Sequence, residues 1–248
     1  MSIIRHIPNA LTSCNLLLGA VGVYLAVNGR PDLTALCILL AAVFDFFDGF
    51  AARALKAYSA IGKDLDSLAD LISFGLAPAA VFSSVIHFQL TGVWRSDFFS
   101  LETTHQILVL SPFILAVFAA LRLAKFNNDS RQTESFIGLT TTATGMFVVS
   151  LVYLFYTSNQ KMLSSTSPWM VLVLVAVFSA LMVSEIPMFS LKFKSFGWKG
   201  NEHRFVLLLI SILALIWLGI GALAVIIPVY VLYSMLLMTR KNVEFEKK

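Results

Sequence analysis

The sequence predicts an all-α integral membrane protein with about eight transmembrane helices. Apolar side chains make up 58% of its 248 residues, and charged side chains only 13%. An average soluble domain has roughly a quarter of its residues charged, so this composition argues against a soluble protein. The apolar residues also form long runs, and each run approaches the ~20 residues that a helix needs to cross a bilayer.

Six of the predicted spans follow one another from the N-terminus. Their approximate ranges are 9–29, 33–52, 68–88, 106–121, 139–157 and 168–188. The last apolar stretch, about 204–238, is too long for one ordinary span. Gly219 and Gly221 lie near its middle. We therefore interpret it as two short helices joined by a tight turn, with one long span as the alternative.

The chain is expected to form one membrane domain over residues 1–248. The sequence contains no internal repeat, no low-complexity stretch and no soluble appendage. The domain divides into a six-helix core, about 1–190, and a C-terminal helical hairpin, about 204–238. No cleavable signal peptide is expected, because one arginine and no small-residue cleavage site precede the first long span.

The distribution of basic residues predicts the orientation of the helices. With the N-terminus in the cytoplasm and eight alternating helices, 15 of the 18 Lys and Arg residues fall in cytoplasmic segments. Only Arg30, Arg95 and Lys161 remain outside, which is a strong positive-inside bias. This topology, together with anionic lipid headgroups, explains the net charge of +4. No nucleic-acid partner is predicted.

Two connecting segments are longer than the others. The outer segment around 89–105 is polar, and the inner segment 190–204 alternates basic and aromatic residues. We expect the inner segment to lie on the membrane surface with its aromatic rings at headgroup depth. Cys14 and Cys37 both fall within predicted spans, so they are expected to be packing residues and not a disulfide or a metal motif.

Four aspartates mark the cytoplasmic ends of the second and third predicted helices. Asp45 and Asp48 are three residues apart, and Asp66 and Asp70 are four apart, so each pair shares a helix face. The two helices are antiparallel and joined by a short turn. All four carboxylates can therefore converge on one cavity.

A single aspartate at a helix end would be a solvated cap, but four acids on adjacent helices need another explanation. Each acid placed deeper in the membrane costs roughly 2.5–3.5 kcal/mol on insertion scales. The four also repel one another unless cations neutralise them. No His or Cys accompanies them, so the pattern favours two hard divalent cations with oxygen ligands, Mg²⁺ or Mn²⁺.

Gly49 and Arg53 indicate the substrate of this site. They are four residues apart and lie beside Asp45 and Asp48. The glycine leaves the helix surface open to a bulky ligand, and the arginine can hold a phosphate through two donors. For Arg53 alone, a positive-inside residue is the alternative. Together with the metal site, the two residues predict a pyrophosphate-containing lipid substrate.

These residues resemble the signature of the CDP-alcohol phosphatidyltransferase family. The pattern Asp45-x2-Asp48-Gly49-x2-Ala52-Arg53-x8-Gly62-x3-Asp66-x3-Asp70 has every fixed position and spacing of that signature. Ile7–Asn15 looks like the entry to the first helix of the family. Three further segments resemble its integral-membrane phosphatidylserine synthase branch: Leu65–Pro78, Leu121–Asn127 and Met182–Lys192.

The sequence departs from that branch at one place. The branch commonly has proline after a Gly-Leu pair, whereas here Gly138-Leu139 is followed by Thr140–Thr144. This departure leaves the chemistry of the signature intact and bears on the identity of the acceptor.

The resemblance implies a reaction and an assembly. Enzymes of this branch transfer the phosphatidyl group from CDP-diacylglycerol to the hydroxyl of L-serine and release CMP. Family members are homodimers in the cell membrane, with the active site open to the cytoplasm and the bilayer. The resemblance also implies that Asp45, Asp48, Asp66 and Asp70 bind the metals and that Asp70 is the general base.

The resemblance further implies contacts with CDP-diacylglycerol. Its headgroup is expected to lie against Gly49, Arg53 and Ser59, and Ser59 is on the turn between the two helices. Asn9 and Thr12 are candidates for the nucleotide end. As polar residues at the head of a helix, these two could equally be caps.

The acceptor site is predicted at the inner end of the fourth helix, around Arg122, Lys125 and Asn127. Arg122 and Lys125 are three residues apart and can share a face, and an arginine can hold the serine carboxylate through two hydrogen bonds. The alternative is that both basic residues only obey the positive-inside rule.

Two other functions stay open. The same chemistry could use glycerol 3-phosphate, inositol or an inositol phosphate as acceptor. An ion-coupled transporter is the remote alternative. Against it, the sequence shows no inverted repeat, and its acids are expected at one membrane face, not midway.

Overall fold

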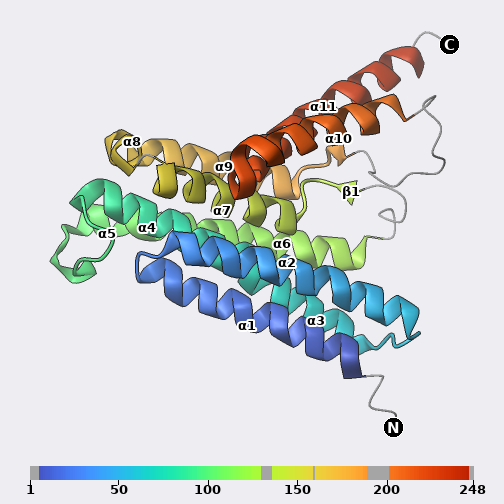
Figure 1. The fold of residues 1–248 in the computed structure, drawn as a ribbon, viewed down its shortest axis with the longest axis horizontal. Helices are drawn as coiled ribbons and strands as arrows, with labels where there is room; N and C mark the ends of the chain where they lie inside the picture. The colour runs from blue at the N-terminus through green and yellow to red at the C-terminus, as the bar shows by residue number, and fades with distance from the viewer. Residues whose placement is uncertain (1–5, 130–135, 159, 189–200, 246–248) are drawn as a thin grey trace.

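The computed structural model describes residues 6–129, 136–158, 160–188 and 201–245, and almost all of them are helical (Figure 1). The spans of the first half are α1 (Ile7–Val27), α2 (Pro31–Ala54), α3–η2–α4 (Ala60–Asp70, Leu71–Leu76, Ala77–Thr91) and α5–η4–α6 (Thr103–Leu110, Ser111–Phe113, Ile114–Asn128). Those of the second half are α7 (Thr141–Ser158), α9 (Pro168–Val183), α10 (Glu202–Leu218) and α11 (Leu223–Phe245). Short helices η3 (Phe98–Ser100), α8 (Gln160–Ser165) and η5 (Gly219–Ala222) lie in the connections.

The predicted all-α membrane fold is confirmed. Within the described ranges, six helical stretches are long and apolar enough to cross a membrane, and one of these, Arg204–Leu236, includes most of α10 and the first part of α11. The helix α9 is shorter, with 16 residues. Counting α9 and separating α10 from α11 gives the eight helices that the sequence predicts.

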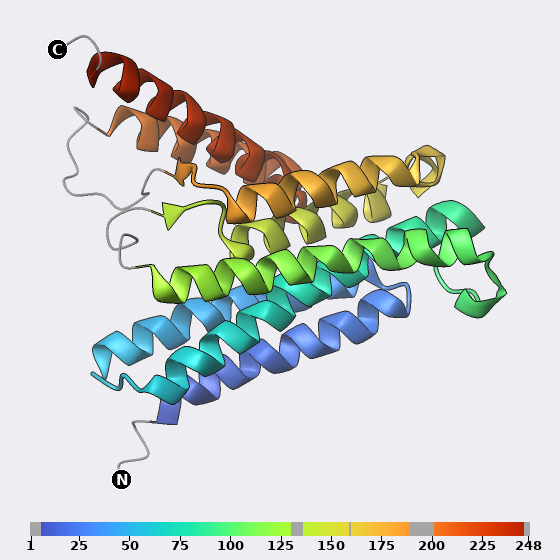
Figure 2. The same cartoon turned by 180° about the vertical axis from the view of Figure 1, so that it is seen from behind.

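The C-terminal stretch is a helical hairpin. Its chain reverses at Gly219, which has a φ of 52°, a conformation that favours glycine. Figures 1 and 2 show α10 and α11 side by side after this turn. The hairpin packs against α7, where a Cβ atom on Gly221 would lie only 2.9 Å from the side chain of Leu154. The interpretation as two helices is therefore confirmed.

The third span begins earlier than predicted, at Ala60 instead of about residue 68. Hydropathy shows only the apolar part of this helix, and its first turns carry Lys63 and Asp64. At its other end the span runs through the centre of the bundle. Nearly every side chain of α4 is buried, whereas α1 and α2 each bury only one face.

The buried face of α1 is made of small and polar residues at helical spacing: Pro8, Thr12, Asn15, Gly19, Gly22 and Ala26. Small residues let helices approach closely in a membrane, where apolar attraction between helices is weak. A Cβ atom on Gly19 would lie 2.7 Å from the Cα atom of Ser73 in η2. Backbone therefore packs directly on backbone at this crossing.

The six-residue η2 is a π-helix, an element that is rare and often marks a functional site. Two further helices press on it. A Cβ atom on Gly145 of α7 would lie 2.9 Å from the Cα atom of Phe74, and one on Gly75 would lie 2.9 Å from the Cβ atom of Ala119 in α6. The helices α1, α6 and α7 therefore fix η2 from three sides.

A small β-ladder was not predicted. The strands β1 (Phe136–Ile137) and β2 (Pro187–Met188) pair antiparallel. Just beyond β1, the Gly138 N–H donates to the Ile186 carbonyl at 2.8 Å. The ladder ties the start of α7 to the end of α9. The predicted surface segment 190–204 lies outside the described residues, apart from 201–204.

Candidate functional site

The helices α2 and α3 carry the predicted acidic residues near the turn that joins them. Asp45 and Asp48 lie on the last three turns of α2, and Asp66 and Asp70 lie on α3. Ser59 is the N-cap of α3, and its hydroxyl accepts a hydrogen bond from the Gly62 N–H at 2.9 Å. This cap fixes where the second acidic helix begins.

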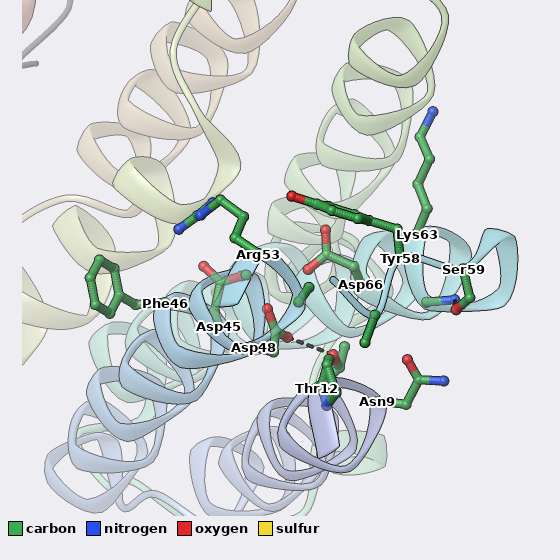
Figure 3. Close-up of a pocket in the computed structure, with 15 residues that line it drawn as sticks. Asn9, Thr12, Asp45, Phe46, Asp48, Arg53, Tyr58, Ser59, Lys63 and Asp66 are labelled. Atoms are coloured by element: carbon green, nitrogen blue, oxygen red, sulfur yellow. Dashed lines mark hydrogen bonds between the residues drawn. The ribbon is translucent and has the colours of Figure 1, made fainter. Parts of the chain in front are cut away.

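Three of the four carboxylates come together. Asp45, Asp48 and Asp66 each offer an oxygen atom, and these oxygens lie within 4.8 Å of one another. Oxygen donors at this spacing, with no His or Cys among them, suit hard divalent cations such as Mg²⁺ or Mn²⁺. Figure 3 shows the three side chains converging from the two helices.

Thr12 orients one of these carboxylates. Its hydroxyl donates to Asp48 Oδ2 at 2.6 Å, and both side chains are buried. The alternative that Asn9 and Thr12 are caps is wrong, because α1 begins at Ile7 and His6 occupies the N-cap position. Thr12 instead acts behind a candidate metal ligand, where an outer hydrogen bond fixes the ligand's orientation.

Asp70 lies one turn deeper than Asp66 and is not part of the group of three. Its Oδ1 atom accepts a hydrogen bond from Asn15 Nδ2 at 3.3 Å. Asp70 is the last residue of α3, directly before the π-helix. The structure thus places the fourth acid beside the close crossing of α1 and η2.

Among the residues that the structure describes, no lysine or arginine forms an ion pair with these carboxylates. The two ion pairs found among the described side chains, Arg30–Asp32 and Lys125–Glu185, involve none of these acids. Buried charges of one sign are costly without compensation. The residues present therefore fit a site that binds divalent cations.

A cavity of about 580 Å³ opens beside the three acids. All five residues predicted to contact CDP-diacylglycerol line it: Asn9, Thr12, Gly49, Arg53 and Ser59. In Figure 3, Arg53 lies on the side of Asp45, and Asn9 lies toward Ser59. The cavity therefore joins the metal-binding acids to a polar end formed by α1 and the turn before α3.

Two glycines of the signature keep this cavity open. A Cβ atom on Gly62 would lie 2.9 Å from Ser59 Oγ and 3.0 Å from Asn9 Oδ1, so a side chain there would displace the polar end. At Gly49 the neighbouring atom is Nη1 of Arg53, 3.6 Å from an ideal Cβ position. The Arg53 guanidinium thus lies across the open surface of α2.

Tyr58 and Lys63 are polar residues of the cavity wall that were not predicted from the sequence. Tyr58 is largely exposed, and Lys63 donates from Nζ to the Asn127 carbonyl at 3.1 Å. A signal existed for both. Tyr58 is the aromatic residue of the turn that joins the two acidic helices, and Lys63 precedes Asp66 by three residues and so shares its helix face.

The three predicted acceptor residues lie in different surroundings. Arg122 is buried and stacks over the Phe126 ring at 4.8 Å, and its Nη2 atom has no hydrogen-bond partner in the described part of the chain. Lys125 is paired with Glu185. Asn127 donates from Nδ2 to Ser67 Oγ at 2.8 Å. Only Arg122 therefore keeps a buried, unused donor.

Comparison with known proteins identifies the family of this fold. The family model described as CDP-alcohol phosphatidyltransferase matches residues 5–181. The CDP-diacylglycerol–serine O-phosphatidyltransferase of Bacillus subtilis (strain 168) is 32% identical over 149 residues, which cover 60% of this chain and 76% of that protein. The protein of the same name from Helicobacter pylori (strain ATCC 700392 / 26695) is 28% identical over 233 residues, 92% of this chain and 89% of that protein.

A third relative carries the same name. The CDP-diacylglycerol–serine O-phosphatidyltransferase of Mycobacterium leprae (strain TN) is 30% identical over 192 residues, which are 75% of this chain and 58% of that protein. The family match includes α1 to α7 and therefore every acid, glycine and arginine that forms the cavity. The geometry and the match agree, and this chain belongs to the CDP-alcohol phosphatidyltransferase family.

Proposed function

We propose that this protein transfers the phosphatidyl group of CDP-diacylglycerol to the hydroxyl of L-serine, giving phosphatidylserine and CMP. The observation that carries the proposal is the group of three carboxylates in the wall of a cavity that borders the spanning helices. The choice of serine is supported by the relatives, whose names specify serine as the acceptor.

The acids would hold the metal ions. Asp45, Asp48 and Asp66 are the proposed ligands, and Asp70 is a further candidate one turn away. Two Mg²⁺ or Mn²⁺ ions bound there would supply positive charge to the pyrophosphate and to the departing CMP. The hydrogen bond from Thr12 would hold the Asp48 carboxylate in the orientation that faces Asp45 and Asp66.

The cavity wall would bind the nucleotide and its pyrophosphate. Arg53 can donate two hydrogen bonds to phosphate oxygens, and Gly49 lets the headgroup approach the backbone of α2. Asn9 and Ser59 close the polar end of the cavity and are the proposed contacts of the nucleotide. The diacylglycerol would extend into the bilayer between the helices.

Asp70 is the proposed general base. A serine hydroxyl is a poor nucleophile until a base within hydrogen-bond reach takes its proton. As Asp70 accepts that proton, the serine oxygen bonds to the phosphorus that carries diacylglycerol. The bond from this phosphorus to CMP breaks, and CMP leaves with the electron pair. Asn15 holds the Asp70 carboxylate in place.

Arg122 is the proposed partner of the serine carboxylate, because its buried Nη2 atom is unused. Lys125 and Asn127 are better explained as structural residues. Their contacts with Glu185 and Ser67 fasten α6 to the segment after α9 and to α3. Of the three residues predicted from the sequence to bind the acceptor, we therefore propose only Arg122.

We also propose a homodimer with its active site at the cytoplasmic face of the cell membrane. The charge distribution supports the orientation, since 15 of the 18 basic residues fall on that side of the predicted topology. The many apolar side chains exposed on α1, α2 and α10 leave ample surface for lipid and for a second subunit.

An acceptor panel tests the function. Purified protein in detergent would receive CDP-diacylglycerol, Mg²⁺ or Mn²⁺ and one radiolabelled acceptor: L-serine, glycerol 3-phosphate or inositol. We expect CMP release and labelled phosphatidylserine with serine alone. A preference for glycerol 3-phosphate or inositol would refute the acceptor assignment, and no CMP release with any acceptor would refute the transferase.

A further inference from the structure

Two buried polar atoms beside Asp70 have no hydrogen-bond partner among the described residues: Asn15 Oδ1 and Arg122 Nη2. Asn15 is 0% exposed and Arg122 is 6% exposed. Native proteins rarely leave such atoms unpaired, and each exception points to a ligand, an ion or an ordered water. Neither atom belongs to the wall of the large cavity.

Both residues interact with the same carboxylate, that of Asp70. Asn15 uses its Nδ2 atom to donate to Asp70 Oδ1, so the orientation of the amide is set and Oδ1 is the atom left over. Arg122 comes from α6, whose Ala119 packs on Gly75 of the π-helix that follows Asp70, and its charge interacts with Asp70. Both residues with an unused atom therefore interact with the proposed general base, Asn15 from α1 and Arg122 from α6.

Close helix crossings fix the backbone near both residues. Asn15 is one turn from Gly19, where α1 packs on the backbone of η2. Arg122 is three residues from Ala119, where α6 packs on Gly75 of the same π-helix. These close crossings hold both residues at the depth of Asp70.

The two atoms need opposite kinds of hydrogen-bond partner. Asn15 Oδ1 only accepts hydrogen bonds, and Arg122 Nη2 only donates them and carries positive charge. A phosphate-bearing acceptor would satisfy Arg122 but bring negative charge to the amide oxygen. A neutral polyol would offer Arg122 no anionic group as a hydrogen-bond acceptor. An α-amino acid satisfies both atoms, because it has a carboxylate and an ammonium group on one carbon.

We propose that Asn15 and Arg122 form a two-point subsite for a zwitterionic amino-acid acceptor next to Asp70. Arg122 Nη2 donates to the α-carboxylate, and Asn15 Oδ1 accepts from the α-ammonium, while Asn15 Nδ2 keeps Asp70 in place. This subsite rests on the proposed function and adds to it the recognition of the amino group. It places the side-chain hydroxyl of the acceptor beside Asp70.

The test uses acceptor analogues that lack the hydroxyl and therefore bind without reacting. L-Alanine has both charged groups, ethylamine only the amine, and propionate only the carboxylate. Their inhibition constants against L-serine would be measured with the full-length wild-type protein and with Asn15→Leu and Arg122→Ala. The KM for CDP-diacylglycerol would be measured in parallel.

The two substitutions are expected to affect different analogues, a result called the crossed pattern below. Asn15→Leu should raise the inhibition constants of L-alanine and ethylamine by about tenfold or more, since each lost hydrogen bond involves a charged group. The inhibition constant of propionate should stay unchanged. Arg122→Ala should weaken L-alanine and propionate but leave ethylamine unchanged. Asn15→Asp should retain the amine-containing inhibitors and lower kcat, because it keeps the acceptor oxygen and loses the donor to Asp70.

Ser150→Ala is the matched control, because Ser150 of α7 is also buried with an unpartnered polar atom. It should change none of these constants. Equal weakening of all three analogues in Asn15→Leu, or no weakening, would overturn the subsite and indicate an ordered water or a packing role. If wild-type protein uses serine but shows no crossed pattern, only the subsite fails. If wild-type protein does not use serine, the proposed function itself fails.

Discussion

At the scale of single residues, the crowding of negative charge around α2 and α3 has the largest consequence. Oxygens of Asp45, Asp48 and Asp66 lie within 4.8 Å of one another, and like charges at such distances repel strongly. Bound cations would convert this repulsion into attraction. The same acids would therefore destabilise the empty site and hold the metal tightly.

The first prediction concerns these ligands. Asp45→Asn, Asp48→Asn and Asp66→Asn should each lower CMP release by orders of magnitude, because each removes charge from a proposed metal ligand. All three variants should elute as wild type in size-exclusion chromatography. An excess of chelator should abolish wild-type activity, and Mg²⁺ or Mn²⁺ should restore it. Full activity in chelator would contradict the metal site.

The second prediction separates the role of Thr12 from that of the ligands. Thr12→Val keeps the shape of the side chain but removes the hydrogen bond to Asp48 Oδ2. Loss of an outer partner of this kind typically costs about 10–100-fold in metal affinity or activity. We expect the concentration of Mg²⁺ that gives half-maximal activity to rise within that range.

Ser13→Ala is the control for Thr12→Val, because the neighbouring hydroxyl donates to the Asn9 carbonyl within α1. It should leave the Mg²⁺ dependence unchanged. If Thr12→Val raised the KM for CDP-diacylglycerol without changing the Mg²⁺ dependence, Thr12 would be a nucleotide contact, as the family resemblance first suggested.

At the scale of elements, the π-helix η2 explains how four helices meet at one depth. Gly19, Gly75 and Gly145 mark its contacts with α1, α6 and α7. In a membrane, close packing of this kind contributes much of the association between helices. The position of Asp70, at the last residue before η2, makes its geometry depend on these three crossings.

The third prediction tests this dependence. Gly19→Ala should lower both the melting temperature and kcat, because its Cβ atom would lie 2.7 Å from the Ser73 Cα atom and must push α1 away. Overpacking a close-packed site typically costs about 1–3 kcal/mol. The shift also moves Asn15 relative to Asp70.

Ala20→Val is the matched control for Gly19→Ala. Ala20 is the next residue of α1 and is exposed toward the lipid, so added carbon atoms there meet no helix. We expect wild-type activity and stability. Thermal unfolding followed by size-exclusion chromatography gives the stability, and CMP release gives the activity. If Gly19→Ala lowered neither the melting temperature nor kcat more than Ala20→Val does, the crossing of α1 and η2 would not control the geometry of Asp70.

At the scale of the whole molecule, the two ends of the bundle differ. The acids and the cavity lie at one end. The turns after α1, α4 and α7 meet at the other, where Gly29 packs against Trp94 and Trp94 Nε1 donates to Gln160 Oε1 at 3.4 Å. Arg30, Arg95 and Lys161, the three basic residues predicted to lie outside, all lie in these connections, with Lys161 on the short helix α8. The structure thus gathers the predicted outer segments at one end.

The fourth prediction concerns the orientation of the two ends. A cysteine at Ser164, after replacement of Cys14 and Cys37, should react with a membrane-impermeant thiol reagent added to intact cells. A cysteine at Ser195, which lies outside the described residues, should react only after the cells are opened. Equal labelling of both positions from the outside would contradict the cytoplasmic active site.

The sequence by itself determined the helical membrane fold, the C-terminal hairpin and the acidic face of α2. Within a bilayer every backbone N–H and C=O group must be satisfied inside the chain, so long apolar runs can only become helices. The spacing of Asp45, Asp48, Gly49 and Arg53 then fixes which side chains share a face, because helical periodicity is local.

Only the tertiary structure decided which of these faces meet. Asn15 forms a hydrogen bond with Asp70, which is 55 residues away in the sequence, and Lys125 pairs with Glu185, which is 60 residues away. The separation of Asp70 from the other acids and the burial of Arg122 also follow from helix neighbours and rotations. Those are set by close contacts between small residues on distant segments, which a periodic pattern along one helix does not specify.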